Sequence, residues 1–316
     1  AIITAYPVRN FSNDVDYVYH QNPDLYYFTG YKEPHSLLLV FKEPQTGADG
    51  KTYNEVFFVQ KRNPRAEQWT GRRLGVEGVK EKLKISNVYN GEAFKDFPVD
   101  FSKFDKIIMD RIPTDVANSQ QDPADLYDLL EQLKSKIGMP APGTRDPRIA
   151  YDLFQQITAS LREIKTEEEL VLLRKAIEIS CAGQVEVMKA IKPSMSEREL
   201  QGIHEFVHKK YGAEHWGYPS IVGAGNNGCV LHYQENDKLH VQNKMVLMDV
   251  GAEYHGYTAD VTRTIPANGK FSTEQKTIYE IVYQAQEAAF KLCREGSSWS
   301  EISNAAREVI AEGLLK

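Results

Sequence analysis

Short apolar runs separated by turn-forming residues dominate the first hundred residues. The runs LYYFTG, SLLLVF, EVFFVQ and DKIIMD occupy residues 25–30, 36–41, 55–60 and 105–110. Apolar stretches of roughly four to eight residues between such breaks are typical of buried strands. The segment EPQTGADGK, residues 43–51, separates the second and third runs and predicts a hairpin-like connection. We therefore expect mostly strands in this part.

Apolar residues spaced by three and four predict helices farther along. One such pattern covers residues 122–137 and ends in Lys and Gly, as helix C-termini prefer. A long amphipathic helix is predicted over residues 161–192, where Thr166 and Glu169 have the spacing of a capping box. Ser196 and Glu199 repeat that spacing before a second helix.

The strongest break in the pattern is GMPAPGTRDPR, residues 138–148, with three prolines and two glycines. It predicts a domain boundary near 150. The expected fold is an α/β N-terminal domain over residues 1–150, followed by an α+β domain over residues 151–316. The last helical pattern, EISNAAREVIAEGLLK, reaches Lys316 directly after its apolar face.

Composition and charge narrow the function. The 316 residues contain 38 Lys and Arg against 44 Asp and Glu, a formal net charge of -6. This balance argues against nucleic acid as the main partner, because phosphate backbones attract basic surfaces. The three cysteines form no CxxC pair, which fits a reducing compartment. Neither a signal-peptide pattern nor a membrane span is visible, so we expect a cytoplasmic protein that does not bind membranes.

One short motif suggests zinc. The run His204-Glu205-Phe206-Val207-His208 is a literal HExxH, in which two imidazoles on one helix face bind zinc and the glutamate acts as a general base. No third ligand follows at a recognisable spacing. The alternative is an amphipathic helix whose two histidines are half exposed at the edge of its apolar stripe, and we favour this alternative.

A second pattern, LMDVGAEYHGYTADVTRT, residues 247–264, predicts a β-hairpin that turns at His255-Gly256. In that register Tyr254 opposes Tyr257, Gly251 opposes Asp260 and Asp249 opposes Thr262, because paired positions keep a constant sum.

The register places Asp249 and Asp260 on one face as diagonal neighbours, about 7 Å apart at Cβ. Two carboxylates at this separation could hold a pair of ions, with Gly251 leaving room for them. Aspartate is disfavoured inside strands and costly to bury unpaired, which favours a site over a solvent-facing polar side of the sheet. Carboxylate ligands suit hard divalent ions such as manganese or magnesium.

Upstream of this hairpin, His232 and Tyr233 end a strand-like run that follows a glycine-rich bend, residues 223–228. We expect His232 at the rim of the same sheet, where it would transfer protons or bind substrate. A partly exposed imidazole without a catalytic role is the alternative. The bend lacks the spacing of a phosphate-binding loop.

Several separated segments together resemble one known family, the Xaa-Pro aminopeptidases (aminopeptidase P) of the creatinase, prolidase and methionine aminopeptidase "pita-bread" superfamily of metallopeptidases. They are SIVGAGNNGCVLHY, VLMDVGAEYHGYTADVTRTIPANGKFSTEQKTIYEIV, RNFSNDVDYVYHQNPDLYYFTGYKEP, EQWTGRRLG and LREIKTEEELVLLRKAIEIS. The similarity runs from about residue 8 to the end of the chain. It implies a pita-bread catalytic domain, of which residues 151–316 form the first part.

The resemblance also implies site residues. Asp249 and Asp260 match metal ligands of a centre with two divalent ions, typically Mn²⁺, with Asp260 bridging. His232 matches a histidine that contacts substrate and assists proton movement. Thr262 would support a ligand, and Tyr218 would line the pocket for the first residue of the substrate.

Asp24 and Trp69 lie in N-terminal motifs that approach active sites within the family's oligomers, so a homo-oligomer, a dimer or a tetramer, is expected. The implied partners are peptides that begin Xaa-Pro. A metal-bridged hydroxide would attack the carbonyl before proline and release the N-terminal residue.

The family pattern has three further ligands, a histidine and two glutamates, which should follow residue 316. We therefore expect the chain to be truncated at its end, and the absence of a first methionine suggests loss at the front as well. Two other functions stay open. One is a prolidase-type dipeptidase, and the other is a pita-bread module that binds peptides or partners without catalysis.

Overall fold

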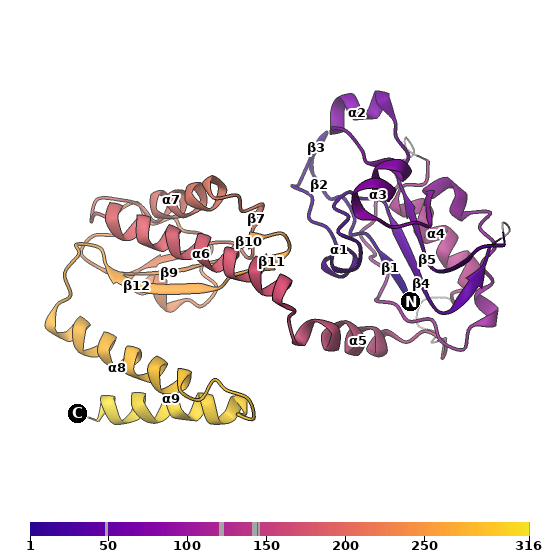
Figure 1. Ribbon diagram of the computed structural model, residues 1–316. Coiled ribbons are helices and arrows are strands. Elements are labelled where there is room, and N and C mark those ends of the chain that lie inside the picture. The colour runs from indigo at the N-terminus through magenta and orange to yellow at the C-terminus, as the bar shows by residue number, and fades with distance from the viewer. Residues whose placement is uncertain (48–49, 120–122, 141–143, 145, 316) are drawn as a thin grey trace. The chain divides into compact units, whose positions relative to one another are not determined.

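The computed structural model describes residues 1–47, 50–119, 123–140, 144 and 146–315 (Figure 1). It separates into two compact units, Ala1–Lys165 and Thr166–Lys316. The expected boundary near 150 lies before helix α5 (Tyr151–Glu163), whereas the division of the chain into units falls after this helix. Phe154 of α5 is buried in the core of the first unit, which explains why this helix belongs there.

A four-stranded sheet lies at the centre of the first unit. Its order is β1-β4-β5-β6, antiparallel except for the β5–β6 pair. Its strands are β1 (Ile2–Thr4), β4 (Leu37–Thr46), β5 (Thr52–Val59) and β6 (Val88–Asn90). A separate exposed hairpin pairs β2 (Asn10–Ser12) with β3 (Val15–Asp16). The strands expected at 36–41 and 55–60 are confirmed, and part of the connection at 43–51 lies outside the described residues.

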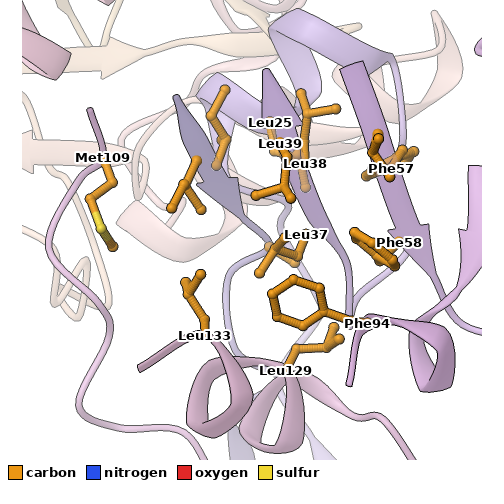
Figure 2. Close-up of a cluster of buried hydrophobic side chains, with 14 of the residues drawn as sticks. Leu25, Leu37, Leu38, Leu39, Phe57, Phe58, Phe94, Met109, Leu129 and Leu133 are labelled. Atoms are coloured by element: carbon orange, nitrogen blue, oxygen red, sulfur yellow. The ribbon is translucent and has the colours of Figure 1, made fainter. Parts of the chain in front are cut away.

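The core of this unit explains the uninterrupted apolar runs (Figure 2). Leu37, Leu38 and Leu39 are consecutive and all buried. Because alternate residues of a strand point to opposite faces, both faces of β4 must be covered. Leu129 and Leu133 of α4 (Leu126–Ile137) belong to the same core.

The expectation of a strand at residues 25–30 is wrong, because this run forms helix α1 (Pro23–Thr29). The Asn22 side chain accepts a hydrogen bond from the Asp24 backbone N–H, and Pro23 occupies the first turn. Gly30 closes the helix in the left-handed conformation with φ 68°. An Asn-Pro start and a Gly end are helix signals, and here they outweigh the aromatic content of the run.

The run at 105–110 forms no strand either. It makes two isolated parallel bridges, Ile2 with Met109 and Ile107 with Ile149. The expected helix at 122–137 is confirmed as α4, which begins after Asp125 and ends at Gly138, although residue 122 lies outside the described residues. The remaining elements of this unit are α2 (Pro64–Thr70), α3 (Gly75–Leu83) and the short 3₁₀ turns η1 (Gly91–Phe94) and η2 (Phe101–Lys103).

The second unit begins with two helices, α6 (Glu167–Ala190) and α7 (Glu197–Lys210). Both expected capping boxes are present, with Thr166 and Ser196 as the capping residues. The long helix expected with Thr166 as its cap is confirmed as α6, whereas residues 161–163 of the predicted range end α5 instead. The break between the two helices falls where the capping box satisfies the first backbone N–H groups of α6.

Two three-stranded sheets follow, with the orders β12-β9-β8 and β11-β10-β7. Their strands are β7 (His215–Trp216), β8 (Ile221–Ala224), β9 (Met245–Val250), β10 (Ala252–Tyr254), β11 (Tyr257–Thr258) and β12 (Val261–Pro266). Helix α6 lies against β10, β11 and β12, and α7 lies against α6 and β8 (Figure 1).

The unit ends in a helix pair, α8 (Thr273–Phe290) and α9 (Trp299–Leu314), which confirms the last helical pattern. The two helices pack against each other (Figure 1). Across the described part of the chain, none of the helices has the length and apolar character needed to span a membrane.

The cap of α1 can be tested directly. We expect Asn22→Ala to lower the free energy of unfolding by about 1–2 kcal/mol, because it removes the cap and a side-chain bond to the Thr4 carbonyl. Asn22→Asp keeps the capping oxygen and should lose less. Urea unfolding followed by circular dichroism measures both. Equal losses in the two variants would contradict the capping role.

Candidate functional site

The hairpin expected at residues 247–264 is present in the predicted register. Tyr254 pairs with Tyr257, and Asp249 pairs with Thr262. The turn residues His255 and Gly256 have φ of 49° and 80°, as a type I′ turn requires. Asp249 therefore lies opposite Thr262 as predicted, whereas Asp260 directly precedes β12, and the expected pair of Gly251 with Asp260 is absent from the ladders of the described strands.

The structure brings Asp249 and Asp260 to the same hydroxyl group. Tyr218 Oη lies 2.5 Å from Asp249 Oδ1 and 3.2 Å from Asp260 Oδ1. The two carboxylate oxygens can be no farther apart than these two distances combined. Burial raises the pKa of Tyr218 well above its ordinary value, and the hydrogen bond to Asp249 and the charges of both aspartates act in the same direction. The hydroxyl therefore stays protonated at neutral pH and donates to the carboxylates.

Two negative charges meet here without a cationic side chain. None of the ion pairs among the described residues includes Asp249 or Asp260. One tyrosine proton compensates two carboxylates only in part, so a hard divalent cation would be stabilised between them. Within the described ranges, no group of three or more His, Cys, Asp or Glu is placed to hold a metal ion. The two aspartates could therefore supply part of the coordination shell of a metal ion, with other ligands supplying the rest.

Gly251 permits the close approach of the strands beside this pair. A Cβ atom at Gly251 would lie 1.9 Å from the Ala259 carbonyl oxygen and 3.0 Å from Tyr218 Cε1. We expected Gly251 to leave room for metal ions. That expectation is wrong for this space, which the Ala259 carbonyl and the Tyr218 ring fill instead.

His232 is not at the end of a strand. Strand β8 ends at Ala224, the 3₁₀ turn η3 (Gly225–Cys229) follows, and His232 lies in an exposed turn beyond it. The glycine-rich bend explains the difference, because a Cβ at Gly223 would come within 2.7 Å of the Gly228 backbone N. The chain therefore folds back on β8 instead of extending. Among the described residues, no hydrogen bond or ion pair joins His232 to either aspartate.

A buried carboxylate that the sequence did not single out holds this loop. Glu197 has 0% exposure and accepts hydrogen bonds from the backbone N–H groups of Ala224 and Lys238. It also accepts from the side chains of Asn227 and Tyr233. Tyr233 follows His232 directly, so Glu197 fixes the backbone next to that histidine. Its place inside a capping box gave no sign of this second role.

The HExxH histidines are buried between helices. His204 and His208 are 0% and 4% exposed, so the expectation that they are half exposed is wrong. A Cβ at Gly183 of α6 would lie 2.9 Å from His204 Nδ1 and 3.2 Å from His208 Nε2, which shows how closely the helices pack. Within the described part of the chain, neither nitrogen of His204 has a hydrogen-bond partner. Burial lowers the pKa of His204 to about 3 and also lowers that of His208, so both imidazoles are neutral.

The other residues singled out in the sequence lie elsewhere. Thr262 is exposed and faces Asp249 across the ladder. In the first unit, Asp24 forms an ion pair with Arg162 at 2.8 Å. Trp69 is 88% exposed and lines a cleft of about 1150 Å³ within that unit, together with Arg72 and other residues. Asp24 and Trp69 thus belong to a different unit from the aspartate pair.

Two family models cover most of the chain. The aminopeptidase P N-terminal domain matches residues 1–106, and metallopeptidase family M24 matches residues 171–316. The Xaa-Pro aminopeptidase of Escherichia coli is 34% identical over 326 aligned residues, which cover 100% of this chain and 69% of the relative. That of Haemophilus influenzae is 30% identical, over 96% of this chain and 65% of the relative.

Solved structures agree with these matches. Aminopeptidase P from E. coli, in a low-pH form, has a TM-score of 0.81 and 30% identity, covering 99% of this chain and 68% of its own. Aminopeptidase PepP of Pseudomonas aeruginosa has the same TM-score, 31% identity and the same coverage. A zinc-substituted E. coli aminopeptidase P in complex with product has a TM-score of 0.79 and 31% identity, again covering 99% of this chain and 68% of its own. The chain spans about two thirds of the length of these relatives.

Gly251→Ala tests the close approach at the aspartate pair. Its Cβ would overlap the Ala259 carbonyl, so we expect a loss of roughly 2 kcal/mol or more in unfolding free energy and weaker Mn²⁺ binding. Gly202→Ala is the matched control, because nothing lies within 4 Å of its added Cβ in helix α7. The control should be neutral or stabilising. Calorimetric unfolding and a MnCl₂ titration measure the two effects, and an unperturbed Gly251→Ala would refute the steric requirement.

The buried His204 predicts acid sensitivity. Its folded pKa lies below the ordinary value of 6.5, so the unfolded chain binds more protons between pH 6.5 and about 3. Stability is therefore complete above pH 6.5 and is lost as the pH falls, by about 1.4 kcal/mol per unit. Between pH 6.5 and 5, His204→Leu should lose about 2 kcal/mol less than the wild type.

Urea unfolding at several pH values measures this slope. The matched control is His240→Gln, which changes an exposed histidine of the same unit and should keep the wild-type slope. If His204→Leu and the wild type lose stability in parallel, another group is responsible for the acid sensitivity.

Proposed function

Because the chain belongs to metallopeptidase family M24, we propose that it forms part of a divalent-metal aminopeptidase that releases the N-terminal residue from peptides with proline in second position. The observation that carries the proposal is the contact of Asp249 and Asp260 with a single hydroxyl. A module that only binds peptides has no need to hold two carboxylates at such close range, where they repel each other. A metal centre uses that arrangement.

The two aspartates would bind the metal ions, and their oxygens match the preference of hard cations. We propose two ions, with Mn²⁺ as the metal used. When bound, such ions lower the pKa of water and polarise the scissile carbonyl. The uncompensated charge of the pair draws the cations to this point, and further ligands or water would complete the coordination shell.

Tyr218 would orient the carboxylates. Its protonated hydroxyl donates to Asp249 and lies within reach of Asp260, so it holds the two side chains toward each other. A phenol with a raised pKa can keep donating while substrate binds, and its ring would line the pocket for the first residue. Thr262, which faces Asp249, would support that ligand from the neighbouring strand.

His232 would bind substrate and move protons. Its exposed turn leaves the imidazole accessible, and the buried Glu197 network fixes the following residue, Tyr233. An accessible histidine on a fixed backbone suits proton transfer near neutral pH. This role rests on the family resemblance and on the loop's support, since no contact with the aspartates carries it.

Proline explains why a metal site is useful for this substrate. The amide before proline carries no N–H, so enzymes that bind substrate as a hydrogen-bonded extended strand lose a contact at this bond. A site that acts on the carbonyl oxygen does not need that N–H.

We also propose that the protein assembles into a dimer or tetramer and is located in the cytoplasm.

For a polypeptide that carries the complete catalytic domain, we expect MnCl₂ to stimulate release of the first residue from a peptide that begins Xaa-Pro-Pro. Asp260→Asn should reduce this activity to the level of the metal-free sample, because it removes a charged ligand without changing side-chain size. Asp105→Asn, which changes an exposed aspartate of the first unit, is the matched control and should keep full activity. Liquid chromatography of the released amino acid measures the rate, and the intact mass is measured on the same sample.

Three outcomes would overturn the proposal in different ways. Cleavage of Xaa-Pro dipeptides alone would identify a prolidase-type dipeptidase. Binding of the peptide without cleavage, at saturating Mn²⁺, would indicate a non-catalytic module. Full activity in Asp260→Asn would show that the metal centre lies elsewhere.

A further inference from the structure

One side chain of helix α6 contacts both strands that carry the aspartate pair. Gln184 Nε2 donates to the carbonyl oxygen of Met248 at 3.1 Å and to that of Val261 at 2.9 Å. Met248 directly precedes Asp249, and Val261 directly follows Asp260. A single amide group therefore ties together the main chain on the two sides of the carboxylate pair.

The buried environment of Gln184 indicates that the two N–H donors of its side-chain amide are what makes glutamine favourable at this position. The side chain is 3% exposed, and its buried Oε1 has no hydrogen-bond partner among the residues that the structure describes. Burying an amide oxygen without a partner costs free energy that an apolar side chain of similar size would avoid. The two N–H groups offset that cost by joining the strands to the helix.

The place where Gln184 binds matters because the pairing of β9 with β12 stops there. Strand β9 ends at Val250 and β12 begins at Val261, so the residues between them leave the β9–β12 sheet near the site. Gly251 has no side chain to pack there. The Gln184 amide is thus a fixed link from outside the sheet, from a helix that lies against β10, β11 and β12.

We propose that Gln184 is a positioning residue that sets the spacing of the Asp249 and Asp260 carboxylates and thereby the affinity of the site for divalent metal. The metal part of this inference rests on the proposed function. The Met248 carbonyl belongs to the peptide group that joins Met248 to Asp249, whereas the Val261 carbonyl lies one residue beyond Asp260. A shift of either carbonyl therefore displaces main chain close to an aspartate, and a metal site responds strongly to the geometry of its ligands. Side chains that orient ligands typically change metal affinity by about 10–100-fold when replaced.

The same helix provides a matched control one turn earlier. Ser180 is 0% exposed, and its Oγ accepts a hydrogen bond from the Ala252 backbone N–H at 2.9 Å. It also joins α6 to the hairpin, but beyond Gly251 and away from the residues next to the aspartates. Ser180→Ala therefore removes a buried contact of the same kind without touching the carbonyls that Gln184 binds.

The first measurement is titration of the intact chain with MnCl₂ alone by isothermal calorimetry. We expect Gln184→Leu to weaken Mn²⁺ binding by about 10–100-fold, because leucine fills the space and lacks both donors. Gln184→Glu should weaken it as well, since it places an acceptor against two carbonyl oxygens. Ser180→Ala should keep the wild-type affinity even where its unfolding free energy falls by as much as that of Gln184→Leu.

The second measurement needs no metal. In protein labelled with ¹³C at the tyrosine rings, Tyr218→Phe identifies the Tyr218 signal, which reports the hydrogen bonds to the two aspartates. Gln184→Leu should shift this signal, and Ser180→Ala should leave it in place. An unchanged signal and unchanged Mn²⁺ affinity in Gln184→Leu would overturn the inference, as would equal changes in Ser180→Ala.

The two measurements separate this inference from the proposed function. If the polypeptide with the complete catalytic domain neither binds Mn²⁺ nor cleaves Xaa-Pro-Pro peptides, the proposed function fails. The Tyr218 signal then decides alone whether Gln184 positions the carboxylates. If the wild type does bind Mn²⁺ and only the Gln184 variants lose affinity, both stand.

Discussion

The second unit has to hold two aspartates close together although their charges repel each other, and its other contacts around the site serve this requirement. Asp249 and Asp260 lie against one tyrosine hydroxyl, and the described ion pairs give them no cationic partner. Folding must therefore hold two like charges together through strand pairing, the Tyr218 hydroxyl and the Gln184 amide. The β9–β12 pairing places Asp249 opposite Thr262, two residues after Asp260, and the main chain approaches closely at Gly251.

Helix α6 meets two different surfaces with consecutive residues. Gly183 lies against the imidazoles of α7, and Gln184 reaches the strands. Successive residues of a helix point about 100° apart, so neighbouring positions can serve two interfaces. The missing Cβ at Gly183 lets α7 approach closely, and the approach buries His204 without a hydrogen-bond partner. The cost of that burial, about 1–3 kcal/mol for each unpaired polar group, is the price of a tightly packed support for the strands.

The parts of this fold that the sequence predicts are those set by local rules. The hairpin register follows from the turn residues, because pairing positions keep a constant sum, and the capping boxes of α6 and α7 follow from their spacing. The strand expected at residues 25–30 fails because an aromatic run fits either a strand or a helix. There the Asn22 cap decides, together with a terminal glycine. Local rules thus predict which nearby residues pair or cap better than they predict whether an apolar run forms a strand or a helix.

Contacts between distant segments account for what the sequence could not predict. Glu197 looks like an ordinary first-turn glutamate, yet it binds backbone groups at Ala224 and Lys238, which come together only in the folded unit. His232 was expected on a strand, but close approach at Gly223 turns the chain before it.

Gln184 gave no signal either, because its partners are main-chain carbonyls that carry no side-chain signature. A polar residue on the buried face of a helix is the one trace such a link leaves in a sequence. The role of Gln184 becomes clear once Asp249 and Asp260 are seen to neighbour Met248 and Val261 in the sequence. A buried donor that binds main-chain carbonyls can thus position a pair of charged side chains without leaving a motif in the sequence.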